Sequence, residues 1–331
     1  TSSESAIDYS SIAETALECM FTPVANEFIA KHGNITGGEM AFIALGKLGS
    51  REMTASSDLD LIIIYRAQKD GTVSNGERPL SINQYFARLS QRQINALTAL
   101  TQEGGLFEVD MRLRPLGKSG PIASRYSSLS SYYKEQAWTW EHMALTRARV
   151  IFATSNIFRL DIEAKIHDIL TIPRDKDKLL RDVSTMRSKL AREKPSNCLW
   201  SLKYLRGGML DIEFIAQYLA LRHANVTPAI LSKDTLSLIE NLTQQGYIDS
   251  LSGQFMFENM KLFQALQSML SLTVEDEITA DRVFNFSDAL KDRLASVGNS
   301  KDFNSLEAKI KKIAFKVSEI FNQIIEEPAK N

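Results

Sequence analysis

The strongest constraint on the fold lies in residues 40–65, where two short apolar runs flank a segment rich in glycine, serine and acidic residues. The runs at 40–45 and 61–64 are short and aliphatic, which predicts buried strands, and Gly49 and Ser50 mark a turn between them. The second strand opens with Asp58-Leu59-Asp60. Because side chains alternate faces along a strand, Asp58 and Asp60 are predicted to project from the same side, about 7 Å apart.

Two carboxylates beside a glycine turn favour a site for Mg²⁺ and a phosphate chain. The alternative is a strand end with solvated acids, which explains most Asp-x-Asp matches. The complete pattern has seven residues between Gly-Ser and Asp58, within a strand-turn-strand unit. This combination occurs by chance much less often than Asp-x-Asp alone, and it favours the functional interpretation.

Residues 107–115 form the second informative segment, because apolar and charged residues alternate strictly there. The pattern predicts a strand whose core face carries Phe107, Val109, Met111 and Leu113. The opposite face carries Glu108, Asp110, Arg112 and Arg114. An acid followed by two arginines suits a third metal ligand beside a clamp for phosphate. An exposed face stabilised by cross-strand charge pairs is the alternative.

The rest of the chain reads mainly as helices. Helices are predicted over 7–32, after Ser81 up to Gly104-Gly105, and across 127–154, with a polar loop at 67–80. A turn-rich loop follows Pro115, and its Lys118 either touches phosphate or is simply solvated. From about residue 155 the pattern is helical almost throughout. We therefore predict an α+β domain over 1–155 and an all-α helical bundle over 156–331.

Two acids stand out in the helical part. Asp211 and Glu213 follow Gly207-Gly208, at the start of a helix that is apolar around most of its circumference. One interpretation is compensation of the helix dipole by acids in the first turn. The other places both carboxylates at the catalytic cleft. Both interpretations remain open at the level of sequence.

Composition excludes several classes of protein. A net charge of −1 gives no overall field for nucleic acid. Only two cysteines, far apart, indicate reduced thiols in a cytoplasmic protein, and the four histidines form no zinc pattern. We expect no membrane span and no signal peptide. No G-x-G-x-x-G follows the first strand, which excludes a Rossmann dehydrogenase. The chain begins at Thr1, so we expect a segment of a longer protein.

Four groups of motifs together carry a resemblance to a known family. They are G-K-L-G with S-D-L-D-L (46–49 and 57–61), V-D-M-R-L-R-P (109–115), E-Q-A-W-T-W-E-H with R-A-R (135–142 and 147–149), and G-G with D-I-E-F (207–208 and 211–214). From about residue 10 to 320 the chain resembles the glutamine synthetase adenylyltransferase family, a branch of the polymerase β-like nucleotidyltransferases. One departure is Ser50, where the family often has a second glycine.

The resemblance implies a mixed sheet with flanking helices, followed by a helical bundle. It implies transfer of AMP from ATP to a tyrosine of glutamine synthetase, with the PII signalling protein as a regulator. Asp58, Asp60 and Asp110 would hold two Mg²⁺ ions. Contacts to ATP are expected from Gly49, Ser50, Ser57, Arg112, Arg114 and Lys118.

Family members carry two such halves in tandem, one that attaches AMP and one that removes it by phosphorolysis. W-T-W-E-H (138–142) and D-I-E-F (211–214) resemble the C-terminal, adenylylating half more closely. Phosphorolytic removal of AMP is the first alternative, because it uses the same acids. A non-catalytic module that binds nucleotide or PII is the second alternative, and the presence of all three acids argues against it.

Overall fold

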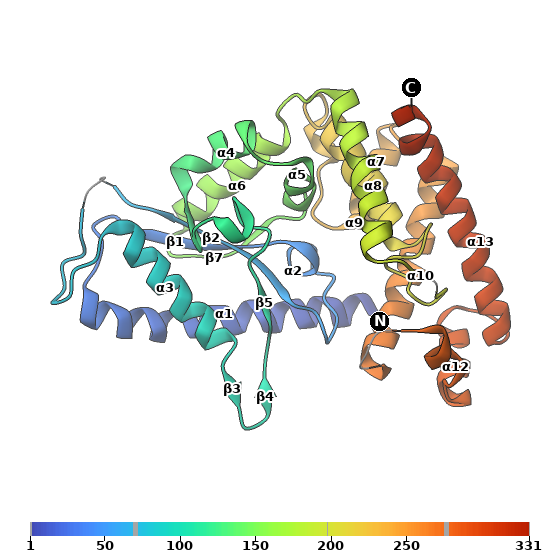
Figure 1. Cartoon of the computed structure of the whole chain (residues 1–331), viewed down its shortest axis with the longest axis horizontal. Coiled ribbons are helices and arrows are strands. Elements are labelled where there is room, and N and C mark those ends of the chain that lie inside the picture. The colour runs from blue at the N-terminus through green and yellow to red at the C-terminus, as the bar shows by residue number, and fades with distance from the viewer. Residues whose placement is uncertain (1, 69–71, 197, 275–277, 331) are drawn as a thin grey trace. The chain divides into compact units, whose positions relative to one another are not determined.

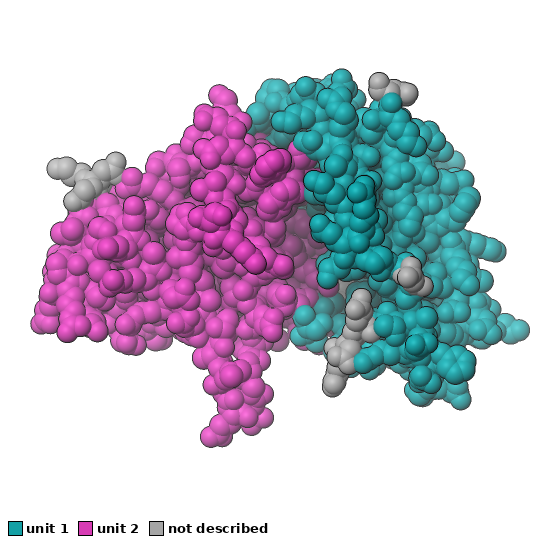
Figure 2. Space-filling view, viewed as in Figure 1, with its two compact units in different colours: residues 1–3, 54–56, 171–331 teal, residues 4–53, 57–170 magenta. Residues whose placement is uncertain are grey.

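The computed structural model describes residues 2–68, 72–196, 198–274 and 278–330. The chain divides into two compact units, which Figure 2 shows in different colours. The sheet unit comprises residues 4–53 and 57–170, and the helical unit comprises residues 1–3, 54–56 and 171–331. The boundary predicted near residue 155 lies before the end of the sheet unit at Leu170, because the helix that follows residue 155 belongs to that unit.

A five-stranded mixed sheet organises the sheet unit (Figure 1). Its strands are β1 (Glu39–Ala44), β2 (Leu59–Arg66), β5 (Val109–Asp110), β6 (Ala123–Arg125) and β7 (Arg149–Ala153). β1 pairs antiparallel with β2 and β7, whereas β2 pairs parallel with β5 and β6. Two further short strands, β3 (Leu100–Thr101) and β4 (Gly104–Gly105), form a separate hairpin. The sheet and the helices that follow confirm the predicted α+β fold class.

The helices α1 (Ser2–His32) and α3 (Ile82–Leu97) contribute to one hydrophobic core with alternate residues of β1 and β2. Phe21 and Phe28 of α1 and Phe86 of α3 pack in this core with Phe42 of β1. Ala41 and Ile43 of β1 and Ile62 and Ile64 of β2, which point to the opposite face, are also buried, and this explains the continuous apolar runs of the two strands. The remaining helices of this unit are α2 (Gly46–Ser50), α4 (Leu129–Glu135), α5 (Thr139–Leu145) and α6 (Asn156–Leu170), with 3₁₀ turns η1 (Gly117–Ser119) and η2 (Tyr126–Ser128).

Several predicted elements differ from the structure. Of the strand predicted over 107–115, only Val109 and Asp110 pair with a neighbour. The chain then turns, because the backbone N–H of Arg112 donates to the Asp110 carboxylate at 2.8 Å and Leu116 adopts a left-handed conformation, with φ of 63°. The helical prediction over 127–154 missed β7, and α3 ends well before Gly104-Gly105. Where a simple turn was predicted, Gly46–Ser50 form the short helix α2.

In the part of the helical unit that the structure describes, the regular secondary structure is helical, as predicted. They are α7 (Lys176–Glu193), α8 (Met209–His223), α9 (Thr235–Gln244), α10 (Ser250–Thr273), α11 (Ala280–Phe284), α12 (Asp288–Val297) and α13 (Phe303–Phe321), with short turns η3 (Pro228–Ile230), η4 (Asn322–Glu326) and η5 (Pro328–Lys330). α8 is buried along most of its length. Trp200 is also buried, stacks on Phe303 with 4.9 Å between ring centroids, and donates to Glu307 at 2.9 Å. None of the described helices is long and apolar enough to cross a membrane.

Candidate active site

The candidate site begins where β1 ends and α2 starts. Gly46 has φ of +51°, and a Cβ atom added to it would lie 2.1 Å from Oδ2 of Asp60. The Asp60 carboxylate therefore lies directly against the backbone of Gly46, an approach that a side chain would block. The backbone N–H of Leu45 also donates to the Asp60 carbonyl at 2.9 Å. Sequence analysis assigned no role to Gly46, although its position as the first glycine of G-K-L-G was the available signal.

Arg149 on β7 holds α2 in place. Its guanidinium donates to the carbonyls of Leu48 (2.7 Å) and Gly49 (3.0 Å) and to the Glu14 carboxylate of α1 (2.7 Å). Burial tends to raise the pKa of Glu14, but its bonds and charge interactions with Arg149 and Arg51 outweigh this and lower that pKa. Arg149 belongs to the R-A-R motif. Sequence analysis did not predict that this motif anchors α2.

Gly49 and Ser50, predicted to contact ATP, are the last two residues of α2. A Cβ atom at Gly49 would lie 2.1 Å from the carbonyl oxygen of Arg147. The N–H of Gly49 donates to the Leu45 carbonyl at 2.8 Å. The Ser50 hydroxyl donates to Glu52 at 2.7 Å and lies 3.1 Å from the Gly46 carbonyl. Both residues are buried. Their contacts to ATP, and that of half-buried Ser57, stay predictions.

The register of two parallel strands brings Asp60 and Asp110 together. Leu59 pairs with Val109, and Asp60 pairs with Asp110. Paired residues of adjacent strands point to the same face of a sheet, with backbones about 4.8 Å apart. Leu59 and Leu61 are fully buried, so Asp60 alternates to the other face; Asp58 is exposed just before β2. The structure thus joins two segments that sequence analysis connected only through their charges.

Arg112 and Lys118 add positive charge beside these acids. The Arg112 Nε donates to Asp110 Oδ2 at 2.7 Å, and the Arg112 side chain is 71% exposed. Hydrogen bonding and charge from Asp110 raise the pKa of Arg112, and the charges of Asp60 and Asp58 add to this. Burial tends to raise the pKa of Asp110, yet the bonds from Arg112 and the charges of Arg112 and Lys118 hold that pKa below its usual value. Three acids and two cations therefore share one electrostatic neighbourhood.

Arg114, predicted to clamp phosphate, donates to backbone carbonyls on both sides of it in the chain. Its guanidinium bonds the carbonyls of Met111 (2.8 Å) and Pro121 (3.1 Å). In this structure Arg114 closes residues 111–121 into a defined loop, and its contact to ATP stays a prediction.

Tyr132 of α4 and Glu141 of the E-Q-A-W-T-W-E-H segment form a buried pair that supports the same loop. The Tyr132 hydroxyl accepts from the Leu116 N–H at 2.9 Å and donates to Glu141, which is 2% exposed. Glu141 also accepts from the Trp138 N–H at 2.9 Å. Burial and the Glu141 carboxylate raise the pKa of Tyr132 to about 12, so the hydroxyl keeps its proton at neutral pH. The motif therefore positions the loop of Arg112 and Lys118 through Leu116.

The donor chemistry at this site suits Mg²⁺, which prefers carboxylate oxygens. Asp60 and Asp110 are neighbours in register, and Asp58 lies two residues before Asp60. Within the described ranges, however, no three histidine, cysteine or acidic side chains are already gathered into a metal-binding cluster. The residues thus fit the ion in type and strand position, and the two predicted Mg²⁺ ions stay a prediction.

Asp211 and Glu213 lie at the start of α8 in the helical unit. Asp211 is 0% exposed, forms a buried ion pair with Arg187, and accepts from the Gly207 N–H at 2.6 Å. Arg206 lies 3.6 Å from the same carboxylate. These partners favour a structural role for Asp211. Glu213 is half-buried. The expectation that the two acids act at a catalytic cleft stays a prediction.

Comparison with known proteins identifies the family. Residues 4–162 match the family model described as glutamate-ammonia ligase adenylyltransferase. The chain is 44% identical over 97% of its length to a bifunctional glutamine synthetase adenylyltransferase/adenylyl-removing enzyme of Rhodopseudomonas palustris (strain TIE-1), covering 32% of that protein. Over 96% of the chain, identity is 42% to the enzyme of the same name from Bradyrhizobium diazoefficiens, of which 32% is covered.

The chain belongs to the glutamine synthetase adenylyltransferase family. It spans about a third of the length of the curated relatives that it matches, 32% in each case cited above. The family model extends over nearly all of the sheet unit, from α1 into α6. The first three groups of motifs lie in this unit, which also contains Asp58, Asp60 and Asp110.

Proposed function

We propose that this chain transfers AMP from ATP to a tyrosine of glutamine synthetase. The observation that carries the proposal is the pairing of Asp60 with Asp110 beside Gly46, with Asp58 and Arg112 in the same electrostatic neighbourhood. The names of the relatives supply the protein substrate. Regulation by PII stays a prediction from the resemblance.

The chemistry is an in-line displacement at phosphorus. The tyrosine hydroxyl oxygen attacks the α-phosphorus of ATP and forms a new P–O bond. The bond from this phosphorus to the bridging oxygen of the β-phosphate breaks, pyrophosphate leaves with the electron pair, and the phenol proton passes to solvent. Arg112 and Lys118 offer positive charge to the leaving pyrophosphate.

Asp58, Asp60 and Asp110 would hold Mg²⁺, in keeping with their oxygen donors and shared neighbourhood. When bound, the ion would neutralise phosphate charge and lower the pKa of the attacking hydroxyl. Gly46 keeps the Asp60 carboxylate close to the backbone at the start of α2, and Arg149 keeps α2 attached to the sheet. These contacts supply a rigid support for the acids.

The direction of the reaction is part of the proposal. The relatives are named for both attaching and removing AMP. Phosphorolysis would use the same acids, with phosphate attacking tyrosyl-AMP to release ADP. The resemblance of residues 138–142 and 211–214 to the adenylylating half supports transfer from ATP.

The test incubates the purified chain with glutamine synthetase, Mg²⁺ and ATP labelled at the α-phosphate. We expect label on glutamine synthetase, its loss in Asp60→Asn, and full transfer in the control Asp292→Asn, which removes an exposed acid of α12. A parallel reaction supplies adenylylated glutamine synthetase and phosphate. ADP release without forward transfer would reverse the proposed direction, and inactivity in both reactions would favour the non-catalytic alternative. Transfer by Asp60→Asn would remove that carboxylate from the mechanism.

A further inference from the structure

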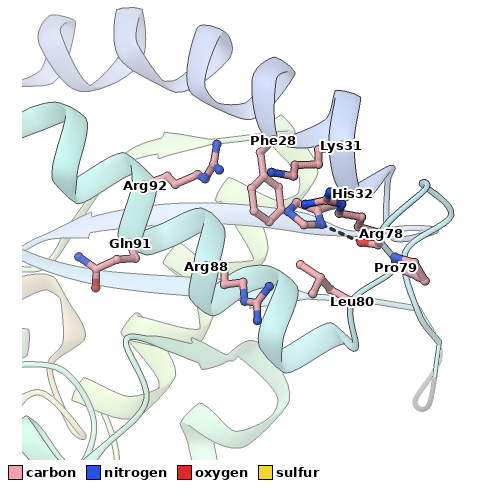
Figure 3. A pocket seen from close by; sticks show the side chains of 9 residues that line it. All are labelled: Phe28, Lys31, His32, Arg78, Pro79, Leu80, Arg88, Gln91 and Arg92. Atoms are coloured by element: carbon pink, nitrogen blue, oxygen red, sulfur yellow. Dashed lines mark hydrogen bonds between the residues drawn. The ribbon is translucent and has the colours of Figure 1, made fainter.

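A second charged region of the sheet unit lies at the other end of β1. A pocket of about 570 Å³ opens there between the end of α1, the segment before α3, and α3 itself (Figure 3). We call it the basic pocket and define it by Lys31, Arg78, Arg88 and Arg92 above the buried side chains of Phe28 and Leu80. Its volume falls within the range of about 300–1,000 Å³ that is typical of small-ligand sites.

The basic pocket is separate from the candidate active site. α1 leads into β1 at Glu39, and Glu39 pairs with Arg66, the last residue of β2. The pocket residues flank this end of the two strands, whereas α2 and Asp60 lie at the opposite end. Six residues of strand, the length of β1, span about 20 Å. A ligand in the basic pocket would therefore not occupy the site of the acids.

The backbone around the pocket is held in place by specific bonds. His32 is buried, and its Nδ1 lies 2.7 Å from the Arg78 carbonyl (Figure 3). The N–H of Arg78 donates to the Lys31 carbonyl at 3.2 Å, and the N–H of Gly76 donates to the His32 carbonyl at 3.1 Å. Gly33 permits this contact, because a Cβ atom there would lie 2.2 Å from the Gly76 nitrogen. The segment that carries Arg78 is thus fixed against α1.

The pocket concentrates positive charge in a chain whose net charge is −1. None of the residues that line it is acidic. Arg92 pairs with Glu27, whose side chain is 78% exposed. Lys31, Arg78 and Arg88 have no carboxylate partner among the residues that the structure describes. Like charges that line one pocket repel one another, and an anion bound between them would offset that repulsion.

We propose that the basic pocket binds a small anion that carries phosphoryl groups. The guanidinium groups of Arg78, in the segment before α3, and of Arg88, in α3, together with the Lys31 ammonium, offer more donors than one carboxylate can accept. A phosphoryl group presents three oxygens and a higher charge. The apolar floor of Phe28 and Leu80 accommodates the uncharged part of such a ligand.

The test uses isothermal titration calorimetry with pyrophosphate as the probe, in buffer that contains a chelator of divalent cations. Without a cation, the carboxylates of the candidate active site repel pyrophosphate. The variant Arg78→Gln with Arg88→Gln removes two exposed charges from the pocket. The control Lys301→Gln with Lys311→Gln removes two exposed charges from the helical unit and makes the same change in net charge.

We expect at least tenfold weaker pyrophosphate binding in the pocket variant and a change of less than twofold in the control. Asp60→Asn should bind pyrophosphate as the unaltered chain does, so the result is independent of the proposed transfer reaction. Equal losses in the two double variants, or loss in Asp60→Asn, would overturn the site. Citrate binding as tightly as pyrophosphate would overturn the phosphoryl assignment, and tighter binding of a polyglutamate peptide would indicate a protein partner instead.

Discussion

At the scale of single residues, the candidate site depends on close approaches that only certain side chains allow. The Asp60 carboxylate touches the space where Gly46 would carry a Cβ atom, and the Asp110 carboxylate is held by Arg112. Small changes of volume or charge at these positions should therefore affect function and stability in different proportions.

Gly46→Ala should abolish AMP transfer. The added methyl group would collide with Asp60, and the left-handed backbone at φ of +51° would cost about 1–2 kcal/mol in stability. Gly246→Ala is a matched control, because Gly246 has φ of +74° but a Cβ atom there would meet nothing within 4 Å. Urea unfolding and the transfer assay together separate the two effects. Equal loss of transfer in both variants would show that the collision with Asp60 is irrelevant.

Asp110 should contribute a pH-dependent part of the stability. Because its pKa in the folded chain lies below the usual 3.8, the Asp110–Arg112 pair stabilises the fold at pH values above that usual pKa. This contribution is lost as the pH falls through the lower folded pKa. Arg112 is largely exposed, so we expect no more than about 1 kcal/mol. Asp110→Asn should therefore lower stability at pH 7 but not at pH 2 in urea titrations. A loss of the same size at both pH values would contradict this account.

At the scale of elements, the helix α2 is too short to be stable on its own, so tertiary contacts must hold it. Arg149 supplies these from β7, a strand adjacent to β1 in the sheet but far away in sequence. The position of the candidate site thus depends on a strand that carries none of the predicted site residues.

Arg149→Gln should destabilise the sheet unit by about 2–3 kcal/mol, because two backbone carbonyls and Glu14 lose charged donors. Transfer activity should fall further than the folded fraction, because α2 would no longer be fixed beside Asp60. The control Arg92→Gln removes an exposed ion pair with Glu27 and should cost less than about 1 kcal/mol. Chemical unfolding and transfer rates at saturating ATP provide the comparison. Unchanged activity in folded Arg149→Gln would show that α2 keeps its position without this arginine.

At the scale of the whole molecule, the two units use buried charge in different ways. The sheet unit leaves Asp58, Asp60 and Asp110 at least partly accessible, whereas the helical unit buries Asp211 with Arg187. Breaking a buried ion pair leaves the remaining charge in a medium that solvates it poorly.

Asp211→Asn should therefore destabilise the helical unit by about 3–5 kcal/mol. Arg187 would be left with a side chain that is 4% exposed and no full negative charge beside it. Glu213→Gln, on the same helix but half-buried, should change stability much less. Unfolding followed by tryptophan fluorescence, in a background that carries Trp138→Phe and Trp140→Phe, reports on this unit through Trp200. Stable Asp211→Asn protein that binds ATP but fails in transfer would instead support a catalytic role for Asp211.

Local patterns in the sequence were sufficient for the elements whose periodicity is strong. The apolar runs of β1 and β2 and the amphipathic helices α1, α3, α7 and α13 are recognisable because each buries a continuous face. The prediction that Asp58 and Asp60 share one side also rests on the alternation of a strand alone, although Asp58 lies just before the first residue of β2. These features require no knowledge of distant residues.

The tertiary structure decided the features that depend on partners far away in sequence. β7 is a strand because it pairs with β1, and only two residues of the segment 107–115 pair with β2, since Arg112 and Leu116 turn the chain away. The close approach of the Asp60 carboxylate to Gly46 and the hydrogen bonds of Arg149 to α2 arise from the same long-range packing. Alternation of residue types determined which side chains share a face, but the register between strands determined that Asp60 and Asp110 meet.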